Sequence, residues 1–99
     1  MKPTILKYND LHLNLGRNVI YDFLKNIRFK NVLDIGAGNG DDLLIAKKIN
    51  PKAKLRAIEL NPSAIESLKK NNIEYFSLNI EKDPISFEDN SLDLIIANE

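Results

Sequence analysis

The sequence predicts an α/β fold, in which a parallel sheet alternates with helices. Three observations predict it. A short apolar run, Asn31–Ile35, ends in glycines and is followed at once by a helical pattern. A second run, residues 54–59, is followed by a strong helix start. A third run, residues 73–78, comes after that helix, and strands that alternate with helices are typical of βαβ units.

The first predicted helix precedes Asn31. Its apolar side chains fall on one face at helical spacing, namely Val19, Ile20, Phe23, Leu24 and Ile27. We expect this face to pack on the sheet.

The later elements follow from their boundary residues. Asn61 and Pro62 form a strong helix start, because Asn is a good N-cap and Pro suits the first helical position. Asn71 and Asn72 end that helix. After an irregular loop over residues 81–91, the apolar residues within 92–97 predict a fourth strand, and Asp93 near its start has a structural role.

An acidic residue near the end of the first strand precedes three glycines at alternate positions: Asp34, Gly36, Gly38 and Gly40. Glycines at a strand-to-helix turn let the backbone come close to a ligand, because no Cβ stands in the way. The next helix points its free N–H groups at the same place. The dinucleotide fingerprint G-x-G-x-x-G would need glycine at 41, where Asp41 stands, and a carboxylate is unfavourable beside a pyrophosphate.

Residues 32–41 resemble motif I of the class I S-adenosylmethionine (SAM)-dependent methyltransferases. The resemblance covers residues 16–99 of a single domain, with residues 1–15 as a lead-in. It implies a three-layer Rossmann-like sheet with helices on both faces and the visible strand order 3-2-1-4. The family core has seven strands in the order 3-2-1-4-5-7-6, so this chain would hold only its amino-terminal half.

The resemblance also implies a SAM site at the carboxyl ends of the strands. Its cofactor-binding residues would be Asp34, Gly36, Ala37, Gly38, Gly40, Glu59, Leu60, Asn79, Ile80 and Asn98. Glu59 would accept hydrogen bonds from both ribose hydroxyls. Asn79 stands where the family usually has an Asp that binds adenine, and its side-chain oxygen can accept the same bond.

The resemblance implies methyl transfer, an in-line displacement that needs no metal and no protein nucleophile, so the absence of cysteine and of metal-ligand clusters does not count against it. The sequence identifies no catalytic base. Asn98 is followed by Glu99 and not by Pro-Pro, which favours a small-molecule or sugar-type acceptor, although nucleic acid is not excluded. Two alternatives stay open: a non-catalytic module that binds SAM or a partner, and an NAD-dependent oxidoreductase, which Asp41 argues against.

Composition and charge indicate an ordinary cytoplasmic domain. No apolar run approaches the length of a membrane span, and the amino-terminal stretch lacks the apolar segment of a secretion signal. The formal net charge of zero hides an excess of basic residues before position 57 and of acidic residues after it, which we interpret as solvated faces.

The predicted strand at 92–97 would form an exposed apolar edge of the partial sheet. Such an edge invites pairing with another chain. We therefore expect either that the chain is a fragment of a longer methyltransferase or that two copies form a homodimer through this edge.

Overall fold

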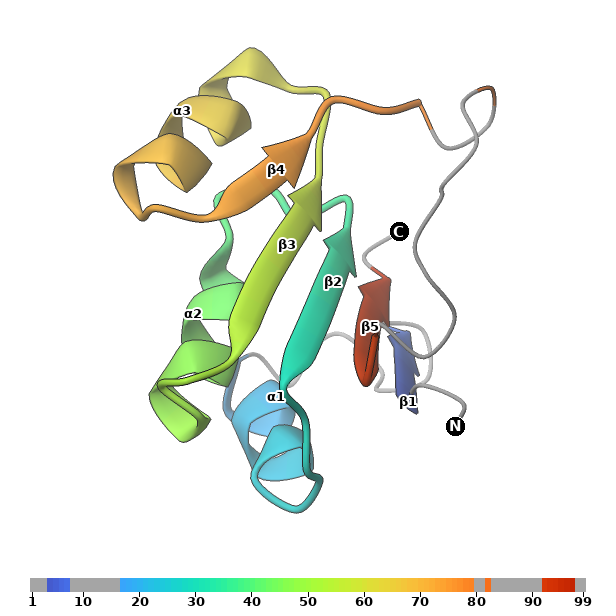
Figure 1. The fold of residues 1–99 in the computed structure, drawn as a ribbon, viewed down its shortest axis with the longest axis vertical. Coiled ribbons are helices and arrows are strands. Elements are labelled where there is room, and N and C mark those ends of the chain that lie inside the picture. Colours follow the sequence, from blue (N-terminus) through green and yellow to red (C-terminus); the bar gives the residue numbers. More distant parts are fainter. Residues whose placement is uncertain (1–3, 8–16, 80–81, 83–91, 98–99) are drawn as a thin grey trace.

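The computed structural model describes residues 4–7, 17–79, 82 and 92–97. Within them, five strands form one sheet in the order β1-β5-β2-β3-β4 (Figure 1). The strands are β1 (Thr4–Lys7), β2 (Asn31–Ile35), β3 (Lys54–Ile58), β4 (Glu74–Phe76) and β5 (Leu94–Ala97). The helices are α1 (Arg17–Leu24), α2 (Asp41–Ile49) and α3 (Pro62–Lys70).

The α/β class and the parallel sheet with flanking helices are confirmed. All four strand pairs are parallel, and β4-β3-β2-β5 is the predicted order 3-2-1-4. Ile35 at the end of β2 is level with Ile58 of β3 and with Ala97 of β5. This register brings the turns that follow β2 and β3 to one edge of the sheet, which is where the candidate site lies.

The expectation that residues 92–97 form an exposed edge is wrong. β1 pairs with β5 along its whole length, from Thr4 opposite Leu94 to Lys7 opposite Ala97. The Thr4 amide also donates to the Asp93 carbonyl at 2.8 Å. The unpaired β5 edge from which a homodimer was expected is therefore covered by the chain's own amino-terminal segment.

Helix α3 begins and ends as its boundary residues predict. The Asn61 side chain accepts from the amides of Ser63 at 2.9 Å and Ala64 at 3.2 Å, and Pro62 occupies the first turn. At the other end Asn72 is left-handed, with φ +57°, and the amide of Ile73 donates to the carbonyl of Leu68 at 3.0 Å.

These last two features are those of a Schellman turn, which uses the backbone of residue 73 to close the helix. The third strand spans Glu74–Phe76 instead of residues 73–78, and the turn explains why it does not begin at residue 73.

The core lies between the sheet and the helices. Figure 1 shows α1 and α2 side by side behind the sheet. The fully buried side chains of the core come from both layers and include Leu24, Val32, Leu43, Ala46, Ala57, Leu68, Leu94 and Ile96. Among the residues that the structure describes, no helix has the length and apolar character needed to cross a bilayer.

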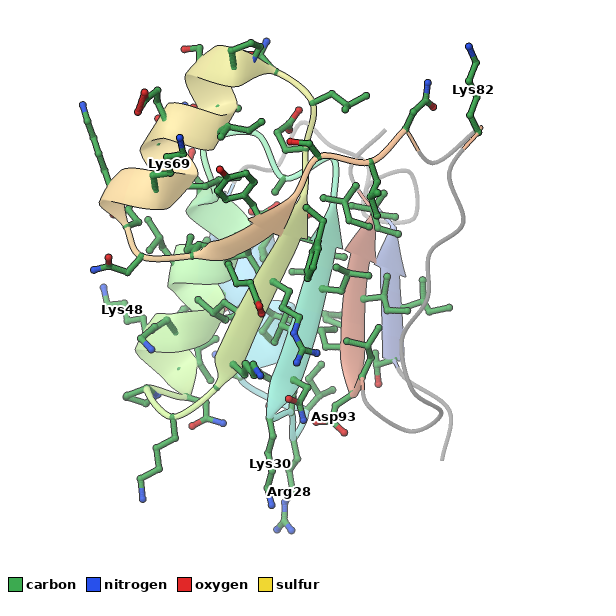
Figure 2. All side chains as sticks on the ribbon, turned by 45° about the horizontal axis from the view of Figure 1, so that its top comes forward. Arg28, Lys30, Lys48, Lys69, Lys82 and Asp93 are labelled. Carbon is green, nitrogen blue, oxygen red and sulfur yellow. The ribbon has the colours of Figure 1, made fainter. Side chains whose placement is uncertain are left out.

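The amino end of the sheet is tied together by Asp93. Its Oδ2 atom accepts from the amide of Lys30 at 2.8 Å and from that of Asn31 at 2.9 Å. Figure 2 shows Asp93 beside Lys30 at the base of β2 and β5. The carboxylate thus joins the starts of two strands that are distant in sequence, which supports the structural role expected for it.

Replacing Asp93 by Ala should lower the free energy of unfolding by about 2 kcal/mol, because two hydrogen bonds to a charged group are lost at a half-buried position. Urea denaturation measures this loss. Asp22→Ala is the matched control, since it removes only the exposed ion pair between Asp22 and Lys25 and should cost under about 0.5 kcal/mol. Equal effects of the two substitutions would contradict the role of Asp93.

Candidate cofactor-binding site

A glycine loop, residues 36–40, connects β2 to α2. The Gly36 amide donates to the carbonyl of Ile58 at 2.9 Å, and the Gly40 amide donates to the Ala37 carbonyl at 3.0 Å. Gly38 and Gly40 are left-handed, with φ +58° and +85°. The loop is therefore a tight turn that is attached on one side to the end of β3.

The space around Gly38 differs from the space around Gly40. A Cβ at Gly38 would meet nothing within 4 Å, whereas a Cβ at Gly40 would lie 2.9 Å from Leu68 Cδ2 and 3.0 Å from Ile73 Cδ1. Gly40 thus lets α2 pack closely on the core. Gly38 instead faces open space, as expected of a backbone segment that a ligand approaches.

Glu59, the residue after β3, joins the glycine loop to the β3–α3 turn. Its Oε1 atom accepts from the Gly38 amide at 2.6 Å. Its Oε2 atom accepts from the amides of Leu60 at 3.0 Å and Asn61 at 3.1 Å. Partial burial raises the pKa of the carboxyl, but the hydrogen bonds from Asn61, Gly38 and Leu60 together outweigh it and hold the pKa below its usual value. The side chain is therefore charged at neutral pH.

An open hollow of about 340 Å³ lies between these turns. It is lined by Gly38, Asn39, Glu59, Asn61, Ser63 and Ala64. Sequence reasoning found Gly38 and Glu59 as site residues but missed the other four. Asn61 was identified only as a helix cap, and that cap places the start of α3 at the edge of the hollow.

The other predicted site residues that the structure describes differ in how far they are exposed. Asp34 is buried, with 1% exposed, so it lies inside the protein below the loop, and Ala37 is buried as well. Leu60 is 52% exposed beside the hollow. Asn79 is half-buried in a turn in which its carbonyl accepts from the Lys82 amide at 3.0 Å. Ile80 and Asn98 lie outside the described residues.

Asp42 is an ionisable residue that the sequence did not indicate as part of the site. It lies in the first turn of α2 and is only 3% exposed. Burial raises the pKa of its carboxyl to about 6. The first turn of α2, directly after the glycine loop, thus carries a buried carboxyl group whose charge changes at mildly acidic pH.

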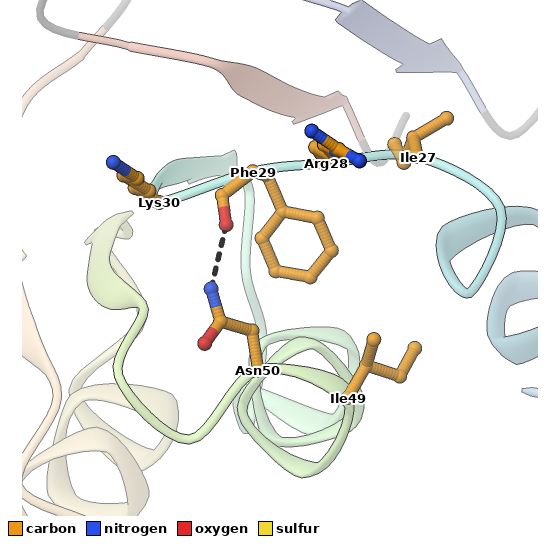
Figure 3. A pocket seen from close by; sticks show the side chains of 6 residues that line it. All are labelled: Ile27, Arg28, Phe29, Lys30, Ile49 and Asn50. Carbon is orange, nitrogen blue, oxygen red and sulfur yellow. Dashed lines mark hydrogen bonds between the residues drawn. The ribbon is translucent and has the colours of Figure 1, made fainter.

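Another hollow, of about 320 Å³, lies away from the site, at the amino end of β2 (Figure 3). It is lined by Ile27, Arg28, Phe29, Lys30, Ile49 and Asn50. The Asn50 side chain donates from Nδ2 to the Phe29 carbonyl at 2.7 Å and so ties the end of α2 to the segment before β2. We interpret this contact as structural.

Gly40→Ala should destabilise the chain more than Gly38→Ala. Both substitutions strain a left-handed position by about 1–2 kcal/mol. Only the methyl group at 40 also meets core side chains, which adds about 1–3 kcal/mol. Urea denaturation of the ligand-free variants tests this order, and equal losses would show that α2 does not pack as described.

Asp42→Asn should stabilise the chain relative to the wild type, and the gain in unfolding free energy should be larger at pH 7.5 than at pH 4.5. Because the pKa of Asp42 in the folded chain, about 6, is above its ordinary value of 3.8, wild-type stability is lost as the pH rises through this interval. The full effect is about 3 kcal/mol. Unfolding free energies of both proteins at the two pH values measure it, and a difference between them that does not change with pH would contradict the raised pKa.

Comparison with known proteins places this arrangement in a family. A family model described as a methyltransferase domain matches residues 28–99. The chain is 35% identical over 97% of its length to ribosomal RNA small subunit methyltransferase C of Buchnera aphidicola subsp. Baizongia pistaciae, of which it covers 30%. It is 38% identical over 67% of its length to methyltransferase str2 of Strobilurus tenacellus, of which it covers 23%.

A solved structure agrees with these relatives. The plantazolicin methyltransferase BpumL, in complex with a monoazolic desmethylPZN analog and SAH, matches with a TM-score of 0.66 and 25% identity over 89% of this chain and 37% of that one. The chain spans less than a third of the length of the ribosomal RNA methyltransferase and of methyltransferase str2. From the strand order, the glycine loop and the family match together, we conclude that this chain belongs to the methyltransferase-domain family, with its Rossmann-like fold.

Proposed function

We propose that this chain binds SAM at the carboxyl edge of its sheet and forms the cofactor-binding half of a methyltransferase that acts on a small-molecule or sugar-type acceptor. The observation that carries the proposal is the bridge between Gly38 and Glu59 over an open polar hollow. It joins a backbone that a ligand can approach to a carboxylate at the tip of the neighbouring strand.

The residues present suit SAM in their chemistry. The space beside Gly38 is open, so the methionine part could lie against main-chain atoms there. Glu59 is charged and half-buried at a strand end, the place from which a ribose hydroxyl can be bound. SAM carries a sulfonium cation and no phosphate, so an edge that also holds Asp41 suits it better than a dinucleotide.

When bound, SAM would supply a methyl group to the acceptor. The electrons of the broken carbon–sulfur bond stay on sulfur. The part of the protein is to bind and orient, because holding donor and acceptor in line supplies much of the acceleration. Gly36, Gly38 and Glu59 form the cradle for this purpose. The described residues include no group that we assign as a base toward the acceptor.

The acidic edge favours a small acceptor over a nucleic acid, because Asp41 and Glu59 would repel a sugar–phosphate backbone that approaches this edge. Ribosomal RNA is the second candidate acceptor, since a relative that is 35% identical is a ribosomal RNA methyltransferase. A non-catalytic SAM-binding module is a further alternative, and activity measurements distinguish it from a methyltransferase.

Isothermal titration should detect binding of SAM and S-adenosylhomocysteine (SAH) but not of NAD, because Asp41 stands where the pyrophosphate fingerprint needs glycine. Gly38→Ala should weaken SAH binding by tenfold or more, since its methyl group enters the space beside the loop. Leu44→Ala, at an exposed position on α2, is the control. Binding of NAD without SAM would refute the proposal.

A transfer assay with labelled SAM, given separately a small-molecule library and structured RNA, then decides the acceptor. Transfer to RNA alone would replace the proposed acceptor by the second candidate. Binding of SAM without any transfer would favour the non-catalytic module.

A further inference from the structure

We propose that the amino edge of the sheet, at the opposite end of the strands from the hollow beside Gly38 and Glu59, is a docking surface for the sugar–phosphate backbone of a nucleic acid. The surface is the basic edge, which we define by six exposed side chains: Arg28, Lys30, Lys47, Lys48, Lys52 and Lys54. It is independent of the proposed cofactor site, so its test needs no SAM.

The topology of the sheet gathers these cations from three separate segments. Arg28 and Lys30 directly precede β2, Lys54 begins β3, and Lys52 lies in the turn before it. The last turn of α2 supplies two more, because this helix runs back from the carboxyl edge of the sheet to its amino edge. Asn31 is level with Lys54, so the starts of β2 and β3 lie side by side. Residues that we interpreted from charge alone as solvated faces thus share one edge.

Two hollows show that cations of different segments border the same surface. One, of about 320 Å³, has Arg28 and Lys30 beside Asn50 at the end of α2 (Figure 3). The other, of about 470 Å³, has Lys47 of α2 beside Lys54 of β3. Figure 2 shows Arg28 and Lys30 projecting away from the protein below β2. The basic edge is therefore one continuous surface that a long anion can follow.

The carboxylates near the basic edge do not neutralise it. Among the residues that the structure describes, none of the six cations forms an ion pair. Asp22 pairs with Lys25 at 3.3 Å, and Glu74 pairs with Arg56 at 3.1 Å, so these charges cancel one another. Asp93 accepts from two backbone amides and contributes one negative charge. In the described part of the chain, the edge thus keeps a clear excess of positive charge.

The helix dipole explains only part of this pattern. Lysine in the last turn of a helix is favoured by the dipole whatever binds there, so Lys47 and Lys48 by themselves indicate no ligand. The other four cations lie outside helices, where the dipole has no such effect. Their position at one edge is what indicates an anionic partner.

The side chains beside these cations favour a nucleic acid over a membrane or an acidic protein. Binding to a membrane surface needs exposed apolar side chains, and protein interfaces have an apolar or aromatic centre. The large apolar side chains that are exposed in the described residues lie outside segments 28–30 and 47–54; they are Ile5, Tyr21, Leu44 and Leu60. A phosphate backbone needs only spaced cations, since each contact adds affinity through the release of counterions.

Distance separates the basic edge from the acidic edge, where Asp41 and Glu59 would repel phosphates. β2 has five residues and therefore spans about 17 Å between the two edges. Charges are screened over about 10 Å at 0.1 M salt. A nucleic acid can thus bind the basic edge without approaching the hollow, whichever acceptor receives the methyl group.

Fluorescence anisotropy with a labelled single-stranded RNA of about 20 nucleotides, longer than one typical binding site, measures the interaction. The wild type should bind this RNA, and its Kd should rise about 20–50-fold between about 50 and 200 mM salt, as three or four phosphate contacts require. The double variant Arg28→Gln, Lys30→Gln should bind about tenfold more weakly, because two of these contacts are lost.

The double variant Lys69→Gln, Lys82→Gln is the matched control. It removes the same net charge from two exposed lysines that lie far from Arg28 and Lys30 in Figure 2. It should change the Kd less than about twofold, because charges at that distance are screened. Equal losses in the two double variants would overturn the proposal. SAH should bind both as it binds the wild type, and failure of SAH to bind the wild type would refute the proposed function without changing the RNA result.

Amide NMR locates the contact without any variant. On addition of the RNA, the amide shifts that move should be those of residues 28–30 and 47–54. Movement mainly at residues 38–40 and 59–63 would overturn the proposal, because the RNA would then occupy the cofactor edge. Absence of RNA binding at about 50 mM salt would overturn it too. Equal affinity for polyglutamate or for phosphatidylserine vesicles would replace the nucleic acid by an acidic protein or a membrane surface.

Discussion

The hydrogen bond from the Gly38 amide to Glu59 is the interaction on which the site depends. It joins two turns whose residues are 21 positions apart in sequence. The two turns meet only because β2 and β3 pair in parallel with Ile35 level with Ile58. That register in turn depends on the core beneath it, where Val32 and Ala57 pack against the helices. The geometry of the hollow is thus a consequence of how the sheet is packed.

The sequence predicted the local parts of this arrangement better than the distant ones. The strand before the glycines and the start of α3 at Asn61 depend on neighbouring residues, so they were visible. β1 was missed, because Thr4–Lys7 is short and pairs with a strand about 90 residues away. The bonds of Glu59 to backbone amides were missed for a similar reason: a backbone N–H carries no mark in the sequence of where the fold will place it.

Two carboxyl groups beside the glycine loop show how burial and hydrogen bonding compete. Burial dominates at Asp42 and raises its pKa to about 6. At Glu59 burial also acts to raise the pKa, but three backbone amides outweigh it. Asp42 therefore contributes stability that is lost as the pH rises, whereas the contribution of Glu59 is lost as the pH falls. The folded chain gains most from these two groups when Asp42 is neutral and Glu59 is charged, a combination that mildly acidic pH favours.

The two ends of the sheet are built for different purposes. At the amino end, Asp93 accepts from the amides of Lys30 and Asn31, and Asn50 donates to the carbonyl of Phe29, so strands and helix are joined by hydrogen bonds from side chains to the backbone. At the carboxyl end, the joining group is Glu59, which lines an open hollow. Because the amino end already fixes where β2, β5 and α2 lie, the carboxyl end can leave an open hollow between its turns without loss of the fold.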